Sequence, residues 1–239
     1  MNNQIKKNFQ MVKGNIKTIA ENCNRDPDEI KLVVVTKAQP VDKIKEVIEA
    51  GADILGENYP EESEDKIVAL QQYQHIQWHM IGHLQSRKIP IVINSFSLIQ
   101  SLDNKNLAEK INKKILEVHK KMPVFIEINI SGEESKKGFP GWHESEWAFL
   151  EVEINQLNAL PGLEVCGLMT MPPFYEDIEK TRPYFSKLRK LRDKISVGQG
   201  LSKNISKLSI GTSVDYKIAI EEGATYVRVG RAIMGERAY

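Results

Sequence analysis

Apolar residues recur every three or four positions at the start of the chain, which places them on one face of a helix. These positions are Ile5, Phe9, Val12, Ile16 and Ile19. After the turn-like NRDPDE the pattern changes to KLVVVTK at 31–37, a short run that is apolar on both faces. Such a run is typical of a strand inside a parallel sheet. One helix followed by a buried strand is therefore expected.

The alternation of apolar strand and amphipathic helix then continues along the sequence. Further strands are predicted at 52–58, 75–82, 97–103, 123–130, 164–171, 207–211 and 226–230. Strict alternation predicts a parallel sheet with helices outside it, and eight strands in 239 residues predict a closed barrel. We expect one domain over residues 1–239, an α/β protein built as a single (β/α)8 TIM-type barrel with an extra N-terminal helix.

Local signals predict two of the helix boundaries. A short helix over 83–88 should stop before Pro90, because proline cannot continue a helix. Asp103 should cap the helix at 107–118, since aspartate is a favoured residue at that position.

Composition indicates which cellular compartment and which kinds of partner to expect. The net charge of +1 gives no electrostatic reason to expect a nucleic acid or an anionic membrane as partner. Cys23 and Cys166 lie far apart without CxxC spacing, which argues against a disulfide scaffold or a zinc site and fits a reducing compartment. The N-terminus is polar, unlike a signal peptide, and no apolar run approaches the roughly 20 residues of a membrane span. A cytoplasmic protein is expected.

In a barrel of this kind the functional site lies at the C-terminal ends of the strands. The polar or small residues expected there are Lys37, Glu57, Asn58, His83, Asp103, Asn129, Met171, Ser213, Arg228, Gly230 and Arg231. Lys37 follows an apolar strand, and burial of its amine would favour the neutral form that makes an imine. A lysine that merely extends from a strand end to water is an equally good interpretation of that position.

Two loops near the C-terminus have the composition of a phosphate site. SIGTS at 209–213 and VRVGRA at 227–232 each end a strand and open a helix, and their small residues allow backbone N–H groups to approach an anion. Barrels often bind phosphate with their last two such loops. Ordinary glycine turns are the alternative. Arg228 faces the same side as Gly230, so it should pair with a ligand atom or with a buried carboxylate such as Glu127.

The histidines do not indicate a metal site. His79 and His83 are four residues apart, but they straddle a strand end, and no third ligand is evident. A structural or ligand-stacking role is expected instead.

Six stretches of the chain have the length and character of family motifs: VVVTKAQP (33–40), GENY (56–59), WHMIGHLQSRK (78–88), INISGEESKKGF (128–139), GLMTMPP (167–173) and LSIGTSVDYKIAIEEGATYVRVGRAIMGER (208–237). Together they resemble the YggS family of pyridoxal phosphate homeostasis proteins. The family is similar to a free-standing barrel domain of alanine racemase.

The resemblance implies a cofactor, pyridoxal 5′-phosphate (PLP), bound as an aldimine to Lys37. It implies that Arg228 faces the pyridine nitrogen, that Ser213, Gly230 and Arg231 surround the phosphate, and that Asn58 and His83 lie in the mouth of the barrel. The family often has methionine at the position of Thr212 and threonine at that of Arg231. Backbone N–H contacts would survive either change.

The resemblance also implies a carrier of PLP rather than an enzyme. Arginine gives up its proton with difficulty, so it leaves the pyridine nitrogen unprotonated and weakens the electron sink. We also expect the protein to lack the second domain of alanine racemase and a counterpart of the tyrosine base that its partner chain supplies. PLP-dependent apoenzymes are the candidate recipients, and a monomer is expected. The alternatives are a PLP-dependent amino-acid racemase and an aldolase barrel that uses Lys37 without a cofactor.

Overall fold

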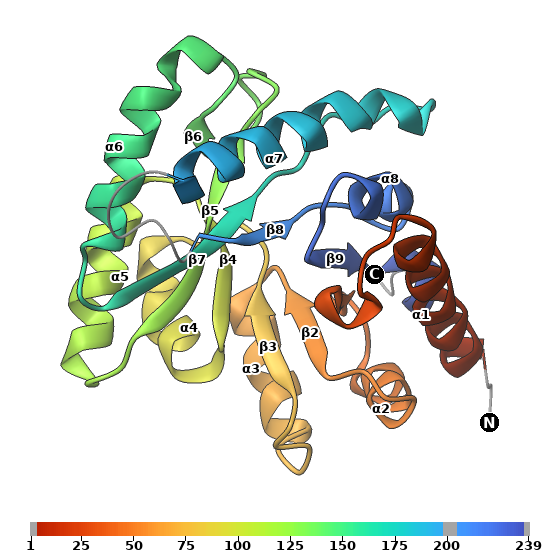
Figure 1. Ribbon diagram of the computed structural model, residues 1–239. Coiled ribbons are helices and arrows are strands. Elements are labelled where there is room, and N and C mark those ends of the chain that lie inside the picture. The colour runs from red at the N-terminus through yellow and green to blue at the C-terminus, as the bar shows by residue number, and fades with distance from the viewer. Residues whose placement is uncertain (1–3, 198–204, 237–239) are drawn as a thin grey trace.

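The computed structural model describes residues 4–197 and 205–236, and these form a closed parallel barrel surrounded by helices (Figure 1). The barrel strands are β1 (Lys31–Val35), β2 (Ile54–Glu57), β3 (Gln77–Met80), β4 (Leu98–Leu102), β5 (Met122–Asn129), β7 (Leu163–Met169), β8 (Lys207–Ser209) and β9 (Tyr226–Val229). Their order is β4-β3-β2-β1-β9-β8-β7-β5, and pairing of β4 with β5 closes the ring. A two-residue strand, β6 (Phe139–Pro140), pairs with the end of β5.

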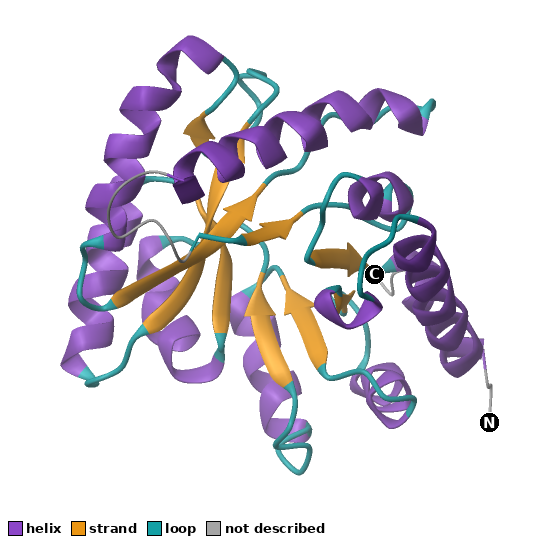
Figure 2. Cartoon of the chain, in the orientation of Figure 1, coloured by secondary structure: helices purple, strands orange, loops and turns teal. Residues whose placement is uncertain are grey.

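Helices lie on the outer side of the strands, as Figure 2 shows by colour. The α-helices are α1 (Gln4–Asn22), α2 (Val41–Glu49), α3 (Pro60–Ala69), α4 (Ile89–Ser95), α5 (Lys105–Glu117), α6 (Trp147–Asn158), α7 (Arg182–Val197), α8 (Tyr216–Glu221) and α9 (Arg231–Met234). Short 3-10 helices are η1 (Pro27–Glu29), η2 (Ser86–Lys88), η3 (Glu144–Glu146) and η4 (Ile178–Thr181). None of the helices in the described residues has the length and apolar character needed to cross a membrane.

The predicted (β/α)8 barrel with an additional N-terminal helix is confirmed. All eight predicted strands form, each within one or two residues of its expected start. The additional helix α1 packs against α2, α8 and α9 on the outside of the barrel (Figure 1). Its predicted apolar stripe faces inward, with Phe9 and Val12 almost fully buried.

Two helix boundaries differ from the prediction. The chain over 83–88 forms only the 3-10 turn η2, and α4 begins at Ile89 with Pro90 in its first turn. The prediction was wrong because proline is well tolerated at that position, where its missing N–H would have no helical partner. The cap of α5 is Asn104, whose side chain accepts from the Leu107 N–H over 2.8 Å, and not Asp103.

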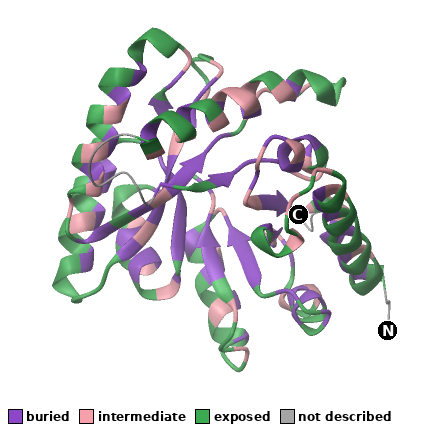
Figure 3. Cartoon of the chain, viewed as in Figure 1, coloured by how far each residue is buried: buried purple, intermediate pink, exposed green. Residues whose placement is uncertain are grey.

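Burial follows the barrel architecture, with buried residues concentrated on the strands and exposed ones on the outer sides of the helices (Figure 3). One apolar core fills the layer between strands and helices. A separate, smaller cluster contains Leu98, Phe125 and Met169, with Cys166 and Tyr226 packed against it. This cluster lies inside the barrel, because its strand residues alternate with those facing the helices. The packed interior leaves the C-terminal ends of the strands as the place for a ligand.

Candidate functional site

One cavity at the C-terminal ends of the strands brings together most of the residues that the sequence singled out. Its volume is about 490 Å³, which is within the usual size range of small-molecule sites. The cavity is lined by all seven residues that the family resemblance implies, namely Lys37, Asn58, His83, Ser213, Arg228, Gly230 and Arg231. Met171 lines it as well, whereas Glu57, Asp103 and Asn129, which were also expected at the strand ends, do not. The lining residues meet because the strand ends of a closed parallel barrel converge on one face.

Lys37 lies two residues beyond β1, although the sequence pattern placed it at the end of the strand. β1 ends at Val35, and the following residues form a turn in which Ala38 has φ +54°. The predicted strand was two residues too long. Strand-like hydrogen bonding does continue to Thr36, because its N–H donates to the Gly56 carbonyl over 3.0 Å, and the chain then turns. Lys37 is half-buried and lines the cavity.

Ser213 ties the two predicted phosphate loops together. Its Oγ accepts hydrogen bonds from the backbone N–H groups of Gly230, over 3.1 Å, and Ala232, over 3.4 Å. The first loop is stabilised from within, since Asp215 Oδ1 accepts from the backbone N–H and the hydroxyl of Thr212 over 2.6 and 2.8 Å. The two loops are therefore joined to each other, and Ser213 and Gly230 lie on one side of the cavity.

The Arg231 side chain is mostly exposed at the edge of the cavity. Its side chain is 74% exposed, and its Nε lies 3.7 Å from Glu236 Oε1. The guanidinium therefore extends toward solvent at the rim. An exposed cation of this kind is screened by water and salt.

Arg228 is buried and fully engaged with the barrel wall. One Nη donates to the backbone carbonyl of Ser209 over 2.7 Å and to its hydroxyl over 2.5 Å. The other donates to the Thr170 carbonyl over 3.0 Å and contacts Met171 Sδ at 2.8 Å. These bonds, and not a direct bond to Glu127, satisfy the guanidinium. Burial lowers the pKa of Arg228 to about 10, so it carries its charge at neutral pH.

A buried carboxylate orients His83 at the cavity. The His83 Nδ1 lies 2.6 Å from Asp103 Oδ2, and the Asp103 side chain is 3% exposed. Since an ionised carboxylate only accepts hydrogen bonds, Nδ1 carries a hydrogen. In the neutral ring, Nε2 is then the basic nitrogen. Asp103 was expected to cap a helix and instead holds this ring, while its other oxygen accepts from the Asn104 amide over 2.7 Å.

Some cavity residues were not singled out from the sequence. Among them, Lys137 and Phe174 line the cavity, with Phe174 79% exposed at its rim. Glu127 also lines it, and burial raises the pKa of Glu127 to about 6, with repulsion from Asp103 adding to the effect. The sequence had singled out Glu127 as a buried carboxylate near Arg228, and the alternation of side chains along β5 places it on the same face as Asn129.

The Asn58 side chain offers a further polar contact to a ligand. Its Oδ1 is buried without a hydrogen-bond partner among the described residues, and the residue lines the cavity. Buried acceptors normally have a partner. An orphaned acceptor beside a cavity is therefore consistent with a polar group supplied by a ligand.

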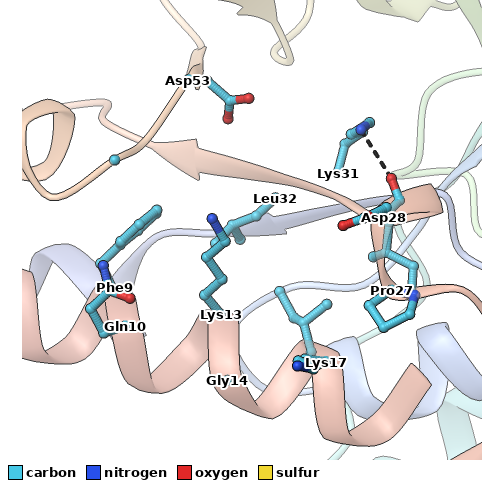
Figure 4. A pocket seen from close by; sticks show the side chains of 13 residues that line it. Phe9, Gln10, Lys13, Gly14, Lys17, Pro27, Asp28, Lys31, Leu32 and Asp53 are labelled. Carbon is cyan, nitrogen blue, oxygen red and sulfur yellow. Dashed lines mark hydrogen bonds between the residues drawn. The ribbon is translucent and has the colours of Figure 1, made fainter. Parts of the chain in front are cut away.

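A second cavity lies at the opposite end of the barrel, beside α1 (Figure 4). Its volume is about 390 Å³, and its wall includes Phe9, Lys13, Lys17 and Asp53. Lys31 donates to the Asp28 carbonyl over 3.0 Å at its edge. None of the expected site residues lines this cavity.

Together, the fold and the cavity define a barrel of the alanine racemase type with a lysine beyond the first strand. An alanine racemase from Clostridium difficile has the same fold, with a TM-score of 0.71 at 19% identity over 95% of this chain and 59% of the racemase. The family model described as "Alanine racemase, N-terminal domain" matches residues 8–238. The chain belongs to this family, within the branch of the pyridoxal phosphate homeostasis proteins.

Curated relatives and solved structures support the assignment of the chain to this family. The pyridoxal phosphate homeostasis protein of Aquifex aeolicus is 38% identical over 224 residues, 94% of each chain. That of Escherichia coli is 35% identical over 240 residues, 99% of this chain and 98% of the relative. A protein of unknown function from Bifidobacterium adolescentis has a TM-score of 0.87 at 33% identity, covering 96% of this chain and 94% of its own.

The PipY protein of Synechococcus elongatus has been solved with PLP bound. Its TM-score is 0.78 at 27% identity, covering 92% of this chain and 99% of PipY. The family resemblance drawn from the motifs is thus confirmed.

Proposed function

We propose that this protein binds PLP in the cavity at the C-terminal ends of the strands and takes part in PLP homeostasis as a carrier. The observation that carries the proposal is that one cavity is lined by all seven residues that the family resemblance implies. When bound, PLP supplies an aldehyde that condenses with an amine to form a Schiff base, and the Lys37 amine is the group proposed to hold it. The names of the relatives and the PLP-bound PipY support this assignment.

The residues around the cavity fit the charge and the polar groups of PLP. The Ser213 hydroxyl, whose oxygen accepts from the Gly230 and Ala232 N–H groups, can donate its own hydrogen to a phosphate. The Asn58 Oδ1, buried and without a partner, offers an acceptor. Arg228 and Lys137 add positive charge to the wall. A dianionic phosphate ester is therefore attracted to the same cavity that Lys37 lines.

Arg228 is the residue that favours a carrier over a catalyst. Its guanidinium is held by four contacts in the barrel wall and remains charged at neutral pH. A cation that keeps its proton cannot protonate a pyridine nitrogen placed against it. We propose that the protein thereby holds PLP without strongly activating it, that it acts as a monomer in the cytoplasm, and that PLP-dependent apoenzymes receive the cofactor.

An amino-acid racemase is the second candidate function, and the position of His83 supports it. A histidine oriented by a buried carboxylate is a common arrangement for a general base, and this one lines the cavity. Racemisation requires a base on the face of the substrate opposite the lysine. Of the residues that line the cavity, His83 has the chemistry of such a base.

An absorbance spectrum with borohydride trapping tests the carrier proposal. Purified protein incubated with PLP should develop an imine band, and reduction should fix the cofactor on Lys37 as mapped by mass spectrometry. Lys37→Ala should lose the band. Uptake at another lysine, or none, would refute the assignment. Incubation with L-alanine or L-serine and chiral analysis separates the two candidates, since robust turnover supports the racemase and trace activity the carrier.

A further inference from the structure

The turn that presents Lys37 has a backbone that needs support from its surroundings. β1 ends at Val35, and Ala38 lies in the left-handed region with φ +54°. For a residue with a Cβ this conformation costs about 1 kcal/mol or more, because the Cβ crowds the following carbonyl oxygen. The turn persists only if neighbouring groups hold it.

Three charged side chains from β2 and α3 provide that support. The Lys66 ammonium donates to the Thr36 carbonyl over 3.0 Å, to Glu57 Oε1 over 2.9 Å and to Glu62 Oε1 over 2.5 Å. Glu57 Oε1 also accepts from the Thr36 hydroxyl over 2.7 Å. Glu62 Oε1 accepts from the Ala38 N–H over 2.9 Å. The Thr36 carbonyl and hydroxyl, which precede Lys37, and the Ala38 N–H, which follows it, are thereby all held in hydrogen bonds.

This arrangement is difficult to explain by stability alone. The side chains of Lys66 and Glu57 are 7% and 0% exposed, and removal of two charges from water costs several kcal/mol per ion. Glu57 Oε2 is buried without a hydrogen-bond partner among the described residues, and burial raises the pKa of Glu57. A buried ion pair often adds less stability than apolar residues of the same volume. Its bonds to the turn indicate a positioning role.

We propose that Lys66, Glu57 and Glu62 form a clamp that sets the backbone of the turn and so aims the Lys37 amine into the cavity. Capture of PLP requires the amine nitrogen to bond the aldehyde carbon while the aldehyde oxygen leaves as water with both amine hydrogens. Such a step is sensitive to placement at the level of 1 Å. The clamp therefore controls how fast the lysine captures PLP, a consequence that rests on the proposed function.

Glu62→Ala tests the clamp with a matched control one residue away. Glu62 is 35% exposed, so its removal should leave the fold intact, and Glu61→Ala removes the same charge from the same turn of α3. Hydrogen exchange of the Ala38 amide should accelerate about tenfold in Glu62→Ala, as loss of one charge-assisted hydrogen bond implies. Capture of PLP on Lys37, trapped with borohydride, should slow by about the same factor.

The conservative variant separates positioning from general destabilisation. Glu62→Gln keeps an oxygen that can accept from the Ala38 N–H, so it should recover most of the capture rate. Glu61→Ala should match wild type in both measurements, because the Glu61 carboxylate pairs with Lys88 over 2.6 Å and does not touch the turn.

The outcomes are distinguishable. If wild-type protein takes up no PLP, the proposed function fails, while exchange of the Ala38 amide still decides whether the clamp exists. If exchange or capture in Glu62→Ala equals that of wild type, the clamp is refuted. Should Glu62→Ala fail to fold by circular dichroism, Thr36→Val tests the clamp at Glu57, because it replaces the hydroxyl that donates to Glu57 with a methyl group. Capture of PLP should then be slower than in wild type, and an unchanged rate would refute the clamp.

Discussion

The Arg228 guanidinium donates to both oxygens of Ser209, over 2.5 Å to the hydroxyl and 2.7 Å to the backbone carbonyl. The Ser209 hydroxyl in turn donates to Gln100 Oε1 over 2.6 Å, and the Gln100 amide lies 2.9 Å from His79 Nδ1. This chain of buried groups runs from the cavity wall into the barrel. The orientation of Arg228 therefore depends on residues that do not line the cavity.

Ser209→Ala should destabilise the protein by about 2 kcal/mol, because it leaves buried partners of the hydroxyl unsatisfied. Gln100 Oε1 would lose its donor and Arg228 one acceptor. Urea unfolding followed by circular dichroism measures the change. Ser86→Ala is the control, since that exposed hydroxyl only accepts from Lys110 at the surface. A loss below about 0.5 kcal/mol in Ser209→Ala would show that the chain of bonds carries little free energy.

Glu127 should make folding stability depend on pH. Its pKa in the folded protein is raised from 4.5 to about 6, first by burial. The folded protein thus holds the proton more tightly than the unfolded chain. The resulting contribution favours folding below pH 4.5 and is lost as the pH rises through about 6. The loss should be about 2 kcal/mol, from a shift of about 1.5 pKa units.

Urea unfolding of wild type and Glu127→Gln at several pH values isolates this effect. The difference between the two proteins should grow in favour of the variant as the pH rises from about 4 to about 7. Glu134→Gln, in the exposed loop after β5, controls for the loss of a carboxylate. A difference that stays constant with pH would contradict the prediction.

The barrel was predictable from the sequence because its strands are short apolar runs with sharp ends. The two helix boundaries that were predicted wrongly lie at residue types that favour more than one local structure. Pro90 stops a helix in its interior but starts one in its first turn, and here it does the latter. Asp103 and Asn104 are both good caps, and the choice between them depends on His83, which lies near Asp103 only in the folded barrel.

The cavity residues were predictable for the same reason, since each follows a strand end and several lie in family motifs. The clamp beneath Lys37 was not. Lys66 and Glu62 belong to a helix whose charged sequence is typical of a solvated face, and nothing local indicates that Lys66 is buried. Its partners Thr36 and Glu57 lie on other elements. Only the packing of α3 against the barrel brings these groups together.

Gly82→Ala should disturb the cavity through its backbone. A Cβ there would lie 2.7 Å from the Asn58 carbonyl oxygen and 2.8 Å from its Cα, so one chain segment must move. We expect a loss of about 1 to 3 kcal/mol in the free energy of unfolding and weaker PLP uptake. Gly14→Ala is the matched control, because a Cβ there meets nothing within 4 Å. In the exposed interior of α1 it should stabilise by up to about 1 kcal/mol. Equal effects of the two substitutions would contradict this prediction.

Ser213 should matter more than Arg231 for binding the phosphate of PLP. Ser213 joins the two loops through the Gly230 N–H and is positioned to donate its own hydroxyl hydrogen, whereas the Arg231 side chain is 74% exposed. In a Lys37→Ala background, where binding is noncovalent, Ser213→Ala should weaken PLP binding about tenfold in equilibrium dialysis. Arg231→Ala should weaken it less than about fivefold, since an exposed charge contributes about 1 kcal/mol or less.

Competition by inorganic phosphate identifies which part of PLP each residue contacts. Phosphate should displace PLP less effectively from Ser213→Ala than from the parent if the hydroxyl binds the phosphate group. Ser86→Ala provides an exposed serine as control. If Arg231→Ala proves the more damaging of the two cavity variants, its side chain must turn from Glu236 into the cavity when PLP binds, and the phosphate site would then depend on the guanidinium rather than on the backbone of the two loops.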